Sequence, residues 1–215
     1  MSLNHYIKNV LEKYKQEKSI YDRLVTYFEK NLAARTYAEI CEGKGWDYVI
    51  DHLTVRAYNI DKAAEHFINL GYKYGEMVDY KNEGWYAKVY RHPNFPVMFI
   101  DQTYDDAPKS LQIIKQWVDK FGDKDYHHIA VLLPKDVEIE ETIDLLKQKG
   151  INFPGKVTGL KGTRLRQIFT QAEVVDGVPY SVLELAQRNP DPKTGKIYTG
   201  FISEQADSLM KDSTL

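Results

Sequence analysis

The sequence has a single cysteine, no long apolar run and no excess of charge of either sign. Because Cys41 is alone, no internal disulfide can form, and nothing favours export to an oxidising compartment. No segment approaches the ~20 apolar residues of a membrane-spanning helix, and the opening MSLNHYIKNVLEKYKQ lacks the apolar core of a signal peptide. We therefore expect a cytoplasmic protein with no membrane partner.

Charge and composition exclude one further class of protein and leave others open. Lys and Arg number 29 against 31 Asp and Glu, a net charge of −2, whereas a general nucleic-acid surface needs a basic excess. With 43% hydrophobic and 28% charged residues, the 215-residue chain can bury a core and remain soluble. Sixteen tyrosines suit either a wet, ligand-lined cavity or a surface that binds a partner. We expect no nucleic-acid partner, and the oligomeric state stays open.

Residues 1–48 are predicted to form N-terminal helices. In HYIKNVLEKYKQEKSIYDRLVTYFEKNL, apolar and tyrosine side chains recur at three- and four-residue spacing, and no proline interrupts them. We expect these helices to form a layer packed on the remainder of the chain; a partner-binding role is the alternative.

From residue 49 onward one β-α-β-β-β pattern occurs twice. In the first module DHLTVRAY is a predicted strand, NIDKAAEHFINLG a helix capped by Asn59 or Asp61 and stopped by Gly71, and YKYGEMVDY, GWYAKVYRH and PVMFIDQ three more strands. In the second, YHHIAVLLP is the strand, KDVEIEETIDLLKQKG the helix, and INFPGKVTGL, TRLRQIFTQAEVV and YSVLELAQR the strands that follow.

The predicted fold class is α+β, with the two modules forming an open mixed barrel around a central metal site and the N-terminal helices packed outside it. The predicted parts are the N-terminal helices (1–48), the first module (49–104), a linker helix (105–125), the second module (126–190) and a C-terminal loop and helix (191–215).

Three polar side chains share one face of the first predicted strand, which is otherwise apolar. They are His52, Thr54 and Arg56, and burying them is costly unless each has a partner. Aligning DHLTV with HHIAV matches His52 with His128 and places His127 on the opposite face, toward solvent or the helices.

A carboxylate in the last predicted strand completes a candidate metal site. Glu184 stands between Leu183 and Leu185 in a strand predicted to be buried, where a charged side chain requires a partner. Two imidazoles and one carboxylate on one side of an octahedral metal leave positions open for a substrate and dioxygen. We therefore predict His52, His128 and Glu184 as metal ligands.

Each of these residues also has a plainer explanation. The two histidines could be hydrogen-bonded core residues, and Glu184 could form a buried ion pair with Arg188 or Arg56. Asp101, in the equivalent closing strand of the first module, could be a fourth ligand, could bond to a ligand, or could be polar only because it ends a strand, which we favour.

Arg56 is the candidate for recognising a substrate. It lies four residues along the strand from His52, ~13 Å at the usual rise, and its guanidinium can bind a carboxylate through two hydrogen bonds. The alternative is a salt bridge to Glu184, Asp101 or a helix carboxylate.

This arrangement resembles the vicinal oxygen chelate superfamily, whose members build one metal site between paired modules. QIFT (167–170) and ELAQR (184–188) are similar to the closing strands of the 4-hydroxyphenylpyruvate dioxygenase type, in which a Q-I-F-T strand precedes an E-x-x-Q-R strand. DHLTVR is closer still to the 2-oxoadipate dioxygenase/decarboxylase family, whose D-H-x-x-x-R strand places the histidine on iron and the arginine on the substrate carboxylate. The resemblance covers residues 50–190.

The resemblance implies an Fe(II)-dependent dioxygenase/decarboxylase that acts on a 2-oxo acid similar to 2-oxoadipate. Its cofactor would be Fe(II) or another divalent metal, and its ligands a small carboxylic acid and dioxygen. Arg56 and Gln167 would bind the substrate, and the tail GFISEQADSLMKDS makes Phe201 a candidate lid, with a packed C-terminal helix as the alternative. Members of the oxoadipate family are usually much longer, so we expect the metal site to carry over but not the identity of the substrate.

Two other functions remain open. One is a metal-dependent isomerase, lyase or hydrolase of the same superfamily, in which the metal acts as a Lewis acid without oxygen; Asp101 as an added ligand would favour it. The other is a non-catalytic module that binds a small molecule without metal.

Overall fold

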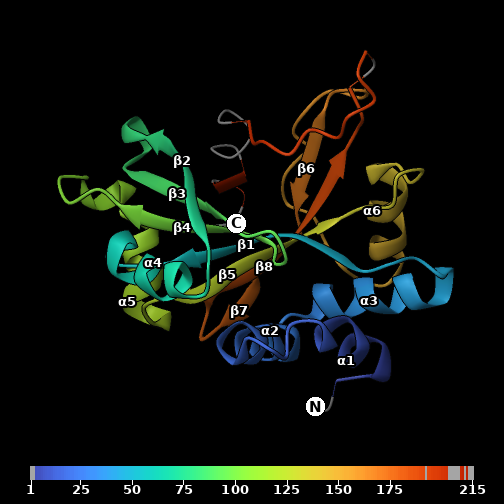
Figure 1. Cartoon of the computed structure of the whole chain (residues 1–215), viewed down its shortest axis with the longest axis horizontal. Coiled ribbons are helices and arrows are strands. Elements are labelled where there is room, and N and C mark those ends of the chain that lie inside the picture. Colours follow the sequence, from blue (N-terminus) through green and yellow to red (C-terminus); the bar gives the residue numbers. More distant parts are fainter. Residues whose placement is uncertain (1–2, 192, 203–208, 211, 213–215) are drawn as a thin grey trace. The chain divides into compact units, whose positions relative to one another are not determined.

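The computed structural model describes residues 3–191, 193–202, 209–210 and 212. The chain divides into two compact units, the first made of Met1–Asp51 with Ala130–Leu215 and the second of His52–Ile129. It passes from one unit to the other within two strands, β1 (Val49–Arg56) and β5 (Asp125–Leu132), which are labelled in Figure 1. The division into five parts stays a prediction.

The first unit begins with three helices, α1 (His5–Glu12), α2 (Lys18–Lys30) and α3 (Leu32–Lys44). The Asn4 side chain accepts a hydrogen bond from the Ile7 N–H, and the Asn31 side chain accepts one from the Ala34 N–H, so both asparagines cap helix starts. The third helix ends at Gly45, whose φ of +69° is a conformation that glycine adopts without strain.

Two buried hydrogen bonds join these helices to β8 (Val178–Arg188) in the same unit. The Tyr27 hydroxyl donates to the Val182 carbonyl, and the Asn31 amide donates to the Ser181 Oγ at 3.1 Å. The N-terminal residues therefore form a layer against the sheet, as predicted.

The other elements of the first unit assemble around β8. The Leu133 N–H donates to the Ala186 carbonyl at 3.0 Å, which places β5 beside β8, and two further strands pair with β8 in antiparallel fashion. Arg166 fastens a helix to this sheet, because its Nη1 donates to Glu140 Oε2 at 3.0 Å and its Nη2 to the other carboxylate oxygen. These elements are α6 (Ile139–Gln148), β6 (Leu165–Phe169) and β7 (Glu173–Val175).

The second unit contains a sheet in the order β2-β3-β4-β1-β5, in which β1 and β4 are parallel and the pairs β2-β3 and β3-β4 are antiparallel. Asn59 caps its first helix by accepting from the Lys62 N–H, and Gly71, with φ +99°, follows the helix end. Its elements are α4 (Ile60–Asn69), β2 (Lys73–Tyr80), η1 (Lys81–Glu83), β3 (Trp85–Arg91), β4 (Val97–Thr103), η2 (Lys109–Leu111) and α5 (Ile113–Phe121).

One predicted strand is wrong. INFPGKVTGL (151–160) contributes only an isolated bridge between Thr158 and Gln167, because Pro154 has no N–H to donate to a ladder. The segment TRLRQIFTQAEVV forms two strands, β6 and β7, rather than one. Of the predicted C-terminal segment GFISEQADSLMKDS, residues 200–202 are not helical, 209–210 and 212 are helical, and the others lie outside the described residues. Leu209 packs with Phe169 and Val182.

Helices together with a mixed sheet give the α+β class that the sequence predicts. Among the described residues, no helix combines the length and the apolar character needed to cross a membrane.

The contact between α6 and β6 predicts a pH-dependent part of the stability. Hydrogen bonds from Arg166 lower the pKa of Glu140 from its ordinary 4.5 to about 2, so the contact stabilises the fold above pH 4.5 and is lost as the pH falls toward 2. We expect Glu140→Gln to lower the urea midpoint at pH 7 and to have a shrinking effect between pH 5 and pH 3. A pH-independent difference between variant and wild type would contradict this.

Candidate metal centre

Two of the three predicted ligands lie together in the second unit. His52 on β1 and His128 on β5 are both buried, and their ring centroids are 5.6 Å apart with the planes at 83°. This is the pair that the internal repeat matches. Their nitrogens are a donor type that suits iron, zinc, copper and nickel.

His128 is held at both ring nitrogens. Its Nε2 is hydrogen-bonded to the Thr54 Oγ1 at 2.8 Å, and its Nδ1 to the Nδ1 of His127 at 2.9 Å. Burial, together with the nearby positive charges of His52 and Arg56, keeps the pKa of His128 well below its ordinary value. The imidazole is therefore neutral near pH 7, and neutral imidazole is the form that binds a metal.

His127 lies against a helix. Its ring meets the Trp117 ring of α5 edge to face at 5.8 Å, and the side chain is buried. Of the two surroundings expected for it, solvent or helices, the structure shows the helix. Burial and the charge of Arg56 lower the pKa of His127, so this ring is also neutral.

The two repeats differ at the position that holds Glu184. The Ala57 N–H donates to the Asp101 carbonyl at 3.0 Å, and the Leu133 N–H donates to the Ala186 carbonyl at the same distance. Ala57 lies five residues after His52, as Leu133 does after His128, so these two bonds are equivalent. Two residues back along each closing strand, Glu184 in one repeat therefore corresponds to Phe99 in the other.

Phe99 packs against His52, with their ring centroids 5.1 Å apart. An aromatic ring supplies no metal ligand, so the first repeat offers His52 from this pair of strands and the second repeat offers both His128 and Glu184.

Glu184 lies on β8 in the first unit and is buried. Its Oε1 accepts a hydrogen bond from the Gln167 Nε2 on the neighbouring β6. Gln167 thus orients the Glu184 carboxylate, and its predicted contact with a substrate stays a prediction. Arg188, suggested by the sequence as an ion-pair partner of Glu184, instead binds Asp51 through two hydrogen bonds of 2.7 and 2.8 Å.

Arg56 is buried beside a carboxylate and an aromatic ring. It stands opposite Asp101 in the β1-β4 register, and its guanidinium lies 5.4 Å from the Trp117 ring centroid. Burial raises the pKa of Asp101 to about 7, although the charges of Arg56 and His52 oppose that rise. Burial also lowers the pKa of Arg56 to about 10, which leaves the guanidinium charged near neutral pH.

Sequence reasoning missed the pairing of Asp51 with Arg188. Asp51 directly precedes His52, and Arg188 follows Glu184 by four residues on the same strand. The signal was present, since each is a charged residue in a strand whose side chains are mostly buried. The candidate lid residue, Phe201, lies over this pair, with its ring centroid 4.9 Å from the Arg188 guanidinium carbon.

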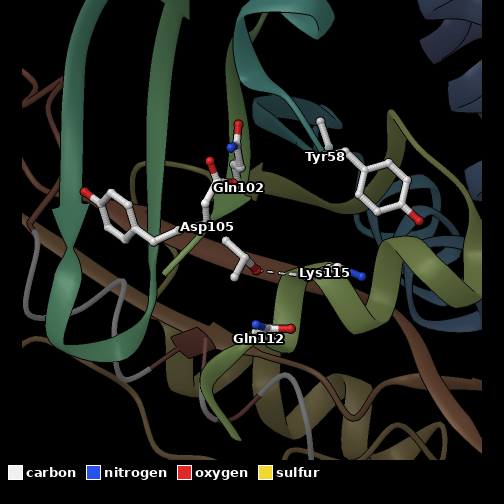
Figure 2. A pocket seen from close by; sticks show the side chains of 8 residues that line it. Tyr58, Gln102, Asp105, Gln112 and Lys115 are labelled. Atoms are coloured by element: carbon white, nitrogen blue, oxygen red, sulfur yellow. Dashed lines mark hydrogen bonds between the residues drawn. The ribbon is translucent and has the colours of Figure 1, made fainter. Parts of the chain in front are cut away.

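A separate cavity of about 180 Å³ lies in the second unit, where the chain leaves β1 and β4. Figure 2 shows the side chains that line it, among them Tyr58, Gln102 and Lys115. The Lys115 N–H donates to the Thr103 Oγ1 at 2.9 Å, and the Lys115 ammonium is paired with Asp119 at 2.8 Å. Because the Lys115 ammonium is already neutralised by Asp119, this cavity offers no free cation for binding an acid through Lys115. Its lining residues are Ala57, Tyr58, Gln102, Thr103, Tyr104, Asp105, Gln112 and Lys115.

Neither a family model nor a curated protein matches the sequence of this chain. Among solved structures, the hydroxyglutarate synthase of Oryza sativa in complex with 2-oxoadipate matches 96% of this chain and 94% of its own, at 17% identity and a TM-score of 0.76. A proposed hydrolase of Shewanella frigidimarina matches 94% of this chain and 100% of its own, at 21% identity and a TM-score of 0.67. A mutant 4-hydroxymandelate synthase of Streptomyces coelicolor matches 78% of this chain and 54% of its own, at 16% identity and a TM-score of 0.60.

At these identities the matches establish the fold alone. The match spans 94% of the solved rice chain, so that chain differs little in length from this one. The architecture of both repeats and the matched structures agree with the family that the sequence motifs resemble. The chain therefore has the vicinal oxygen chelate fold.

Proposed function

We propose that this chain is a non-haem Fe(II)-dependent dioxygenase/decarboxylase acting on a 2-oxo acid similar to 2-oxoadipate. The observation that carries the proposal is the pair of buried imidazoles, His52 and His128, held face to edge on adjoining strands. Glu184 is the carboxylate that would complete the ligand set. Two imidazoles and one carboxylate are the donor set of non-haem Fe(II) oxygenases, which keep positions open for substrate and dioxygen.

The residues present fit a divalent metal. The His128 ring is neutral because of its buried surroundings, and metal binding therefore requires no loss of a proton from it. Phe99 at the position equivalent to Glu184 keeps the number of protein ligands at three. Fe(II), when bound, would activate dioxygen, and dioxygen would be the oxidant for the decarboxylation.

The neighbouring side chains would orient the ligands. Gln167 holds the Glu184 carboxylate through its amide N–H, and the second carboxylate oxygen would be available to a metal. His128 has one hydrogen-bond partner at each ring nitrogen, Thr54 and His127. One of these bonds would give way to the metal, and the other would fix the plane of the ring.

Arg56 would bind a carboxylate of the substrate. It is a buried cation on the same strand as His52, and its planar guanidinium can hold a carboxylate through two hydrogen bonds. A fold shared with a rice enzyme solved in complex with 2-oxoadipate supports an acid of this kind by analogy. Phe201 is proposed as a lid residue that helps to exclude water from the bound acid.

Oxygen consumption tests the proposed reaction. After anaerobic loading with Fe(II), we expect wild-type protein to couple oxygen uptake to carbon dioxide release with 2-oxoadipate or a related 2-oxo acid. Replacing the carboxylate ligand in Glu184→Gln should reduce the rate about 100-fold or more. An oxygen electrode measures the dioxygen consumed, and a carbon dioxide assay measures the product released.

Glu173→Gln is the matched control, because Glu173 lies on the adjacent β7 and accepts a hydrogen bond from the Leu32 N–H. It should keep wild-type turnover. Turnover of a substrate without oxygen, supported by Zn²⁺ or Ni²⁺, would replace the dioxygenase by the isomerase, lyase or hydrolase alternative. Binding of a 2-oxo acid that is unaffected by His52→Ala would indicate a metal-free binding module.

A second prediction concerns Arg56. Arg56→Lys keeps a positive charge beside Asp101 but loses the two-pronged geometry, so KM for the acid should rise ~10-fold. The turnover number should change little, since a contact made equally in the ground and transition states affects binding alone. Steady-state kinetics with a 2-oxo monoacid alongside the diacid would show which carboxylate Arg56 contacts. An unchanged KM for every acid would remove Arg56 from the substrate site.

A further inference from the structure

Arg188, which forms an ion pair with Asp51, also donates hydrogen bonds to the C-terminal segment. Arg188 uses Nε and Nη2 for Asp51, and its Nη1 donates to the carbonyls of Tyr198 and Gly200, each at 2.9 Å. The Phe201 ring then covers the guanidinium at 4.9 Å. One buried side chain thus joins β8, the residue before His52 and residues 198–201.

Residues 198–201 also form a closed turn of their own. The Tyr198 hydroxyl donates to the Phe201 carbonyl at 3.0 Å, and the Tyr198 ring lies 4.4 Å from the Arg164 guanidinium carbon. A Cβ at Gly200 would stand 2.5 Å from the Tyr198 hydroxyl, so an alanine there would displace the Tyr198 ring from its present position. The turn therefore presents its carbonyls to Arg188 as a preformed unit.

A purely stabilising ion pair does not need this geometry. Asp51 alone satisfies one edge of the guanidinium, and the remaining N–H groups could meet side chains of the sheet. They meet two main-chain carbonyls of the tail, which carry no charge and tie down the backbone itself. The position of Phe201 therefore depends on Arg188.

We infer that Arg188 is a positioning residue that fixes residues 198–201, and with them the Phe201 ring, to the strand that carries Glu184. The inference rests on the proposed function insofar as Phe201 acts as the lid over a bound 2-oxo acid. Asp51, the residue before His52, orients the guanidinium from the other side. Asp51 and Arg188 therefore act together in holding residues 198–201.

Amide hydrogen exchange on the full chain tests this directly. Arg188→Lys keeps a charge for Asp51 but loses the planar guanidinium whose separate nitrogens reach Asp51 and the two carbonyls, so exchange in peptides covering 198–201 should speed up ~10-fold or more. In the Fe(II)-loaded enzyme the same variant should raise KM for the 2-oxo acid several-fold and leave the turnover number nearly unchanged.

Arg166→Lys is the matched control. Arg166 is buried to a similar extent on the same sheet, and its guanidinium donates to Glu140 and Gln187 rather than to residues 198–201. It should leave exchange at 198–201 unchanged. Equal acceleration in both variants, or none in Arg188→Lys, would overturn the inference.

Gly200→Ala provides an independent variant if Arg188→Lys does not fold. It leaves Arg188 and Asp51 intact but forces the Tyr198 ring away from the turn, and it should produce the same local acceleration. Because exchange is measured without metal or substrate, it decides the role of Arg188 even if the chain shows no oxygenase activity. Slow exchange at 198–201 in Gly200→Ala would contradict the inference.

Discussion

The cost of burying polar side chains inside the sheets is the constraint on which the rest of this structure depends. His52, His128, Arg56, Asp101 and Glu184 are all buried, on strands whose other residues are mostly apolar. Each buried polar group loses its water and must recover that free energy from a partner. Thr54 is hydrogen-bonded to His128, Gln167 donates a hydrogen bond to Glu184, and Arg56 stands opposite Asp101 in the strand register. The hydrogen bonds around the proposed ligands thus follow from burial, and they also hold those ligands in fixed orientations.

Most of the fold could be predicted because its elements have strong local signals. The Asn59 cap, the glycine after α4 and the two-residue alternation of β1 each act within a few residues of chain. The failure at 151–160 has a different origin. Its apolar residues resemble a strand, but Pro154 removes a donor, and only the tertiary neighbours decide that the segment makes a single bridge to Gln167.

Part of the candidate site could also be predicted from local signals in the sequence. Matching DHLTV with HHIAV is a local comparison, and it is enough to pair His52 with His128. The contacts that bring specificity to the site are not local. Thr54 bonds to His128, and Arg188, one of two possible ion-pair partners of Glu184 in the sequence, binds Asp51. A side chain with several charged neighbours in sequence can satisfy any of them, so only the three-dimensional register decides.

Metal content is the measurement that tests the central claim most directly. Protein purified without chelator, and the same protein after anaerobic addition of Fe(II), should hold close to one divalent ion per chain, and Glu184→Ala should lose it. Glu173→Gln, treated in parallel, should match the wild type. If wild-type protein neither retains a metal nor binds Fe(II), His52, His128 and Glu184 are core polar groups and the proposed chemistry is excluded.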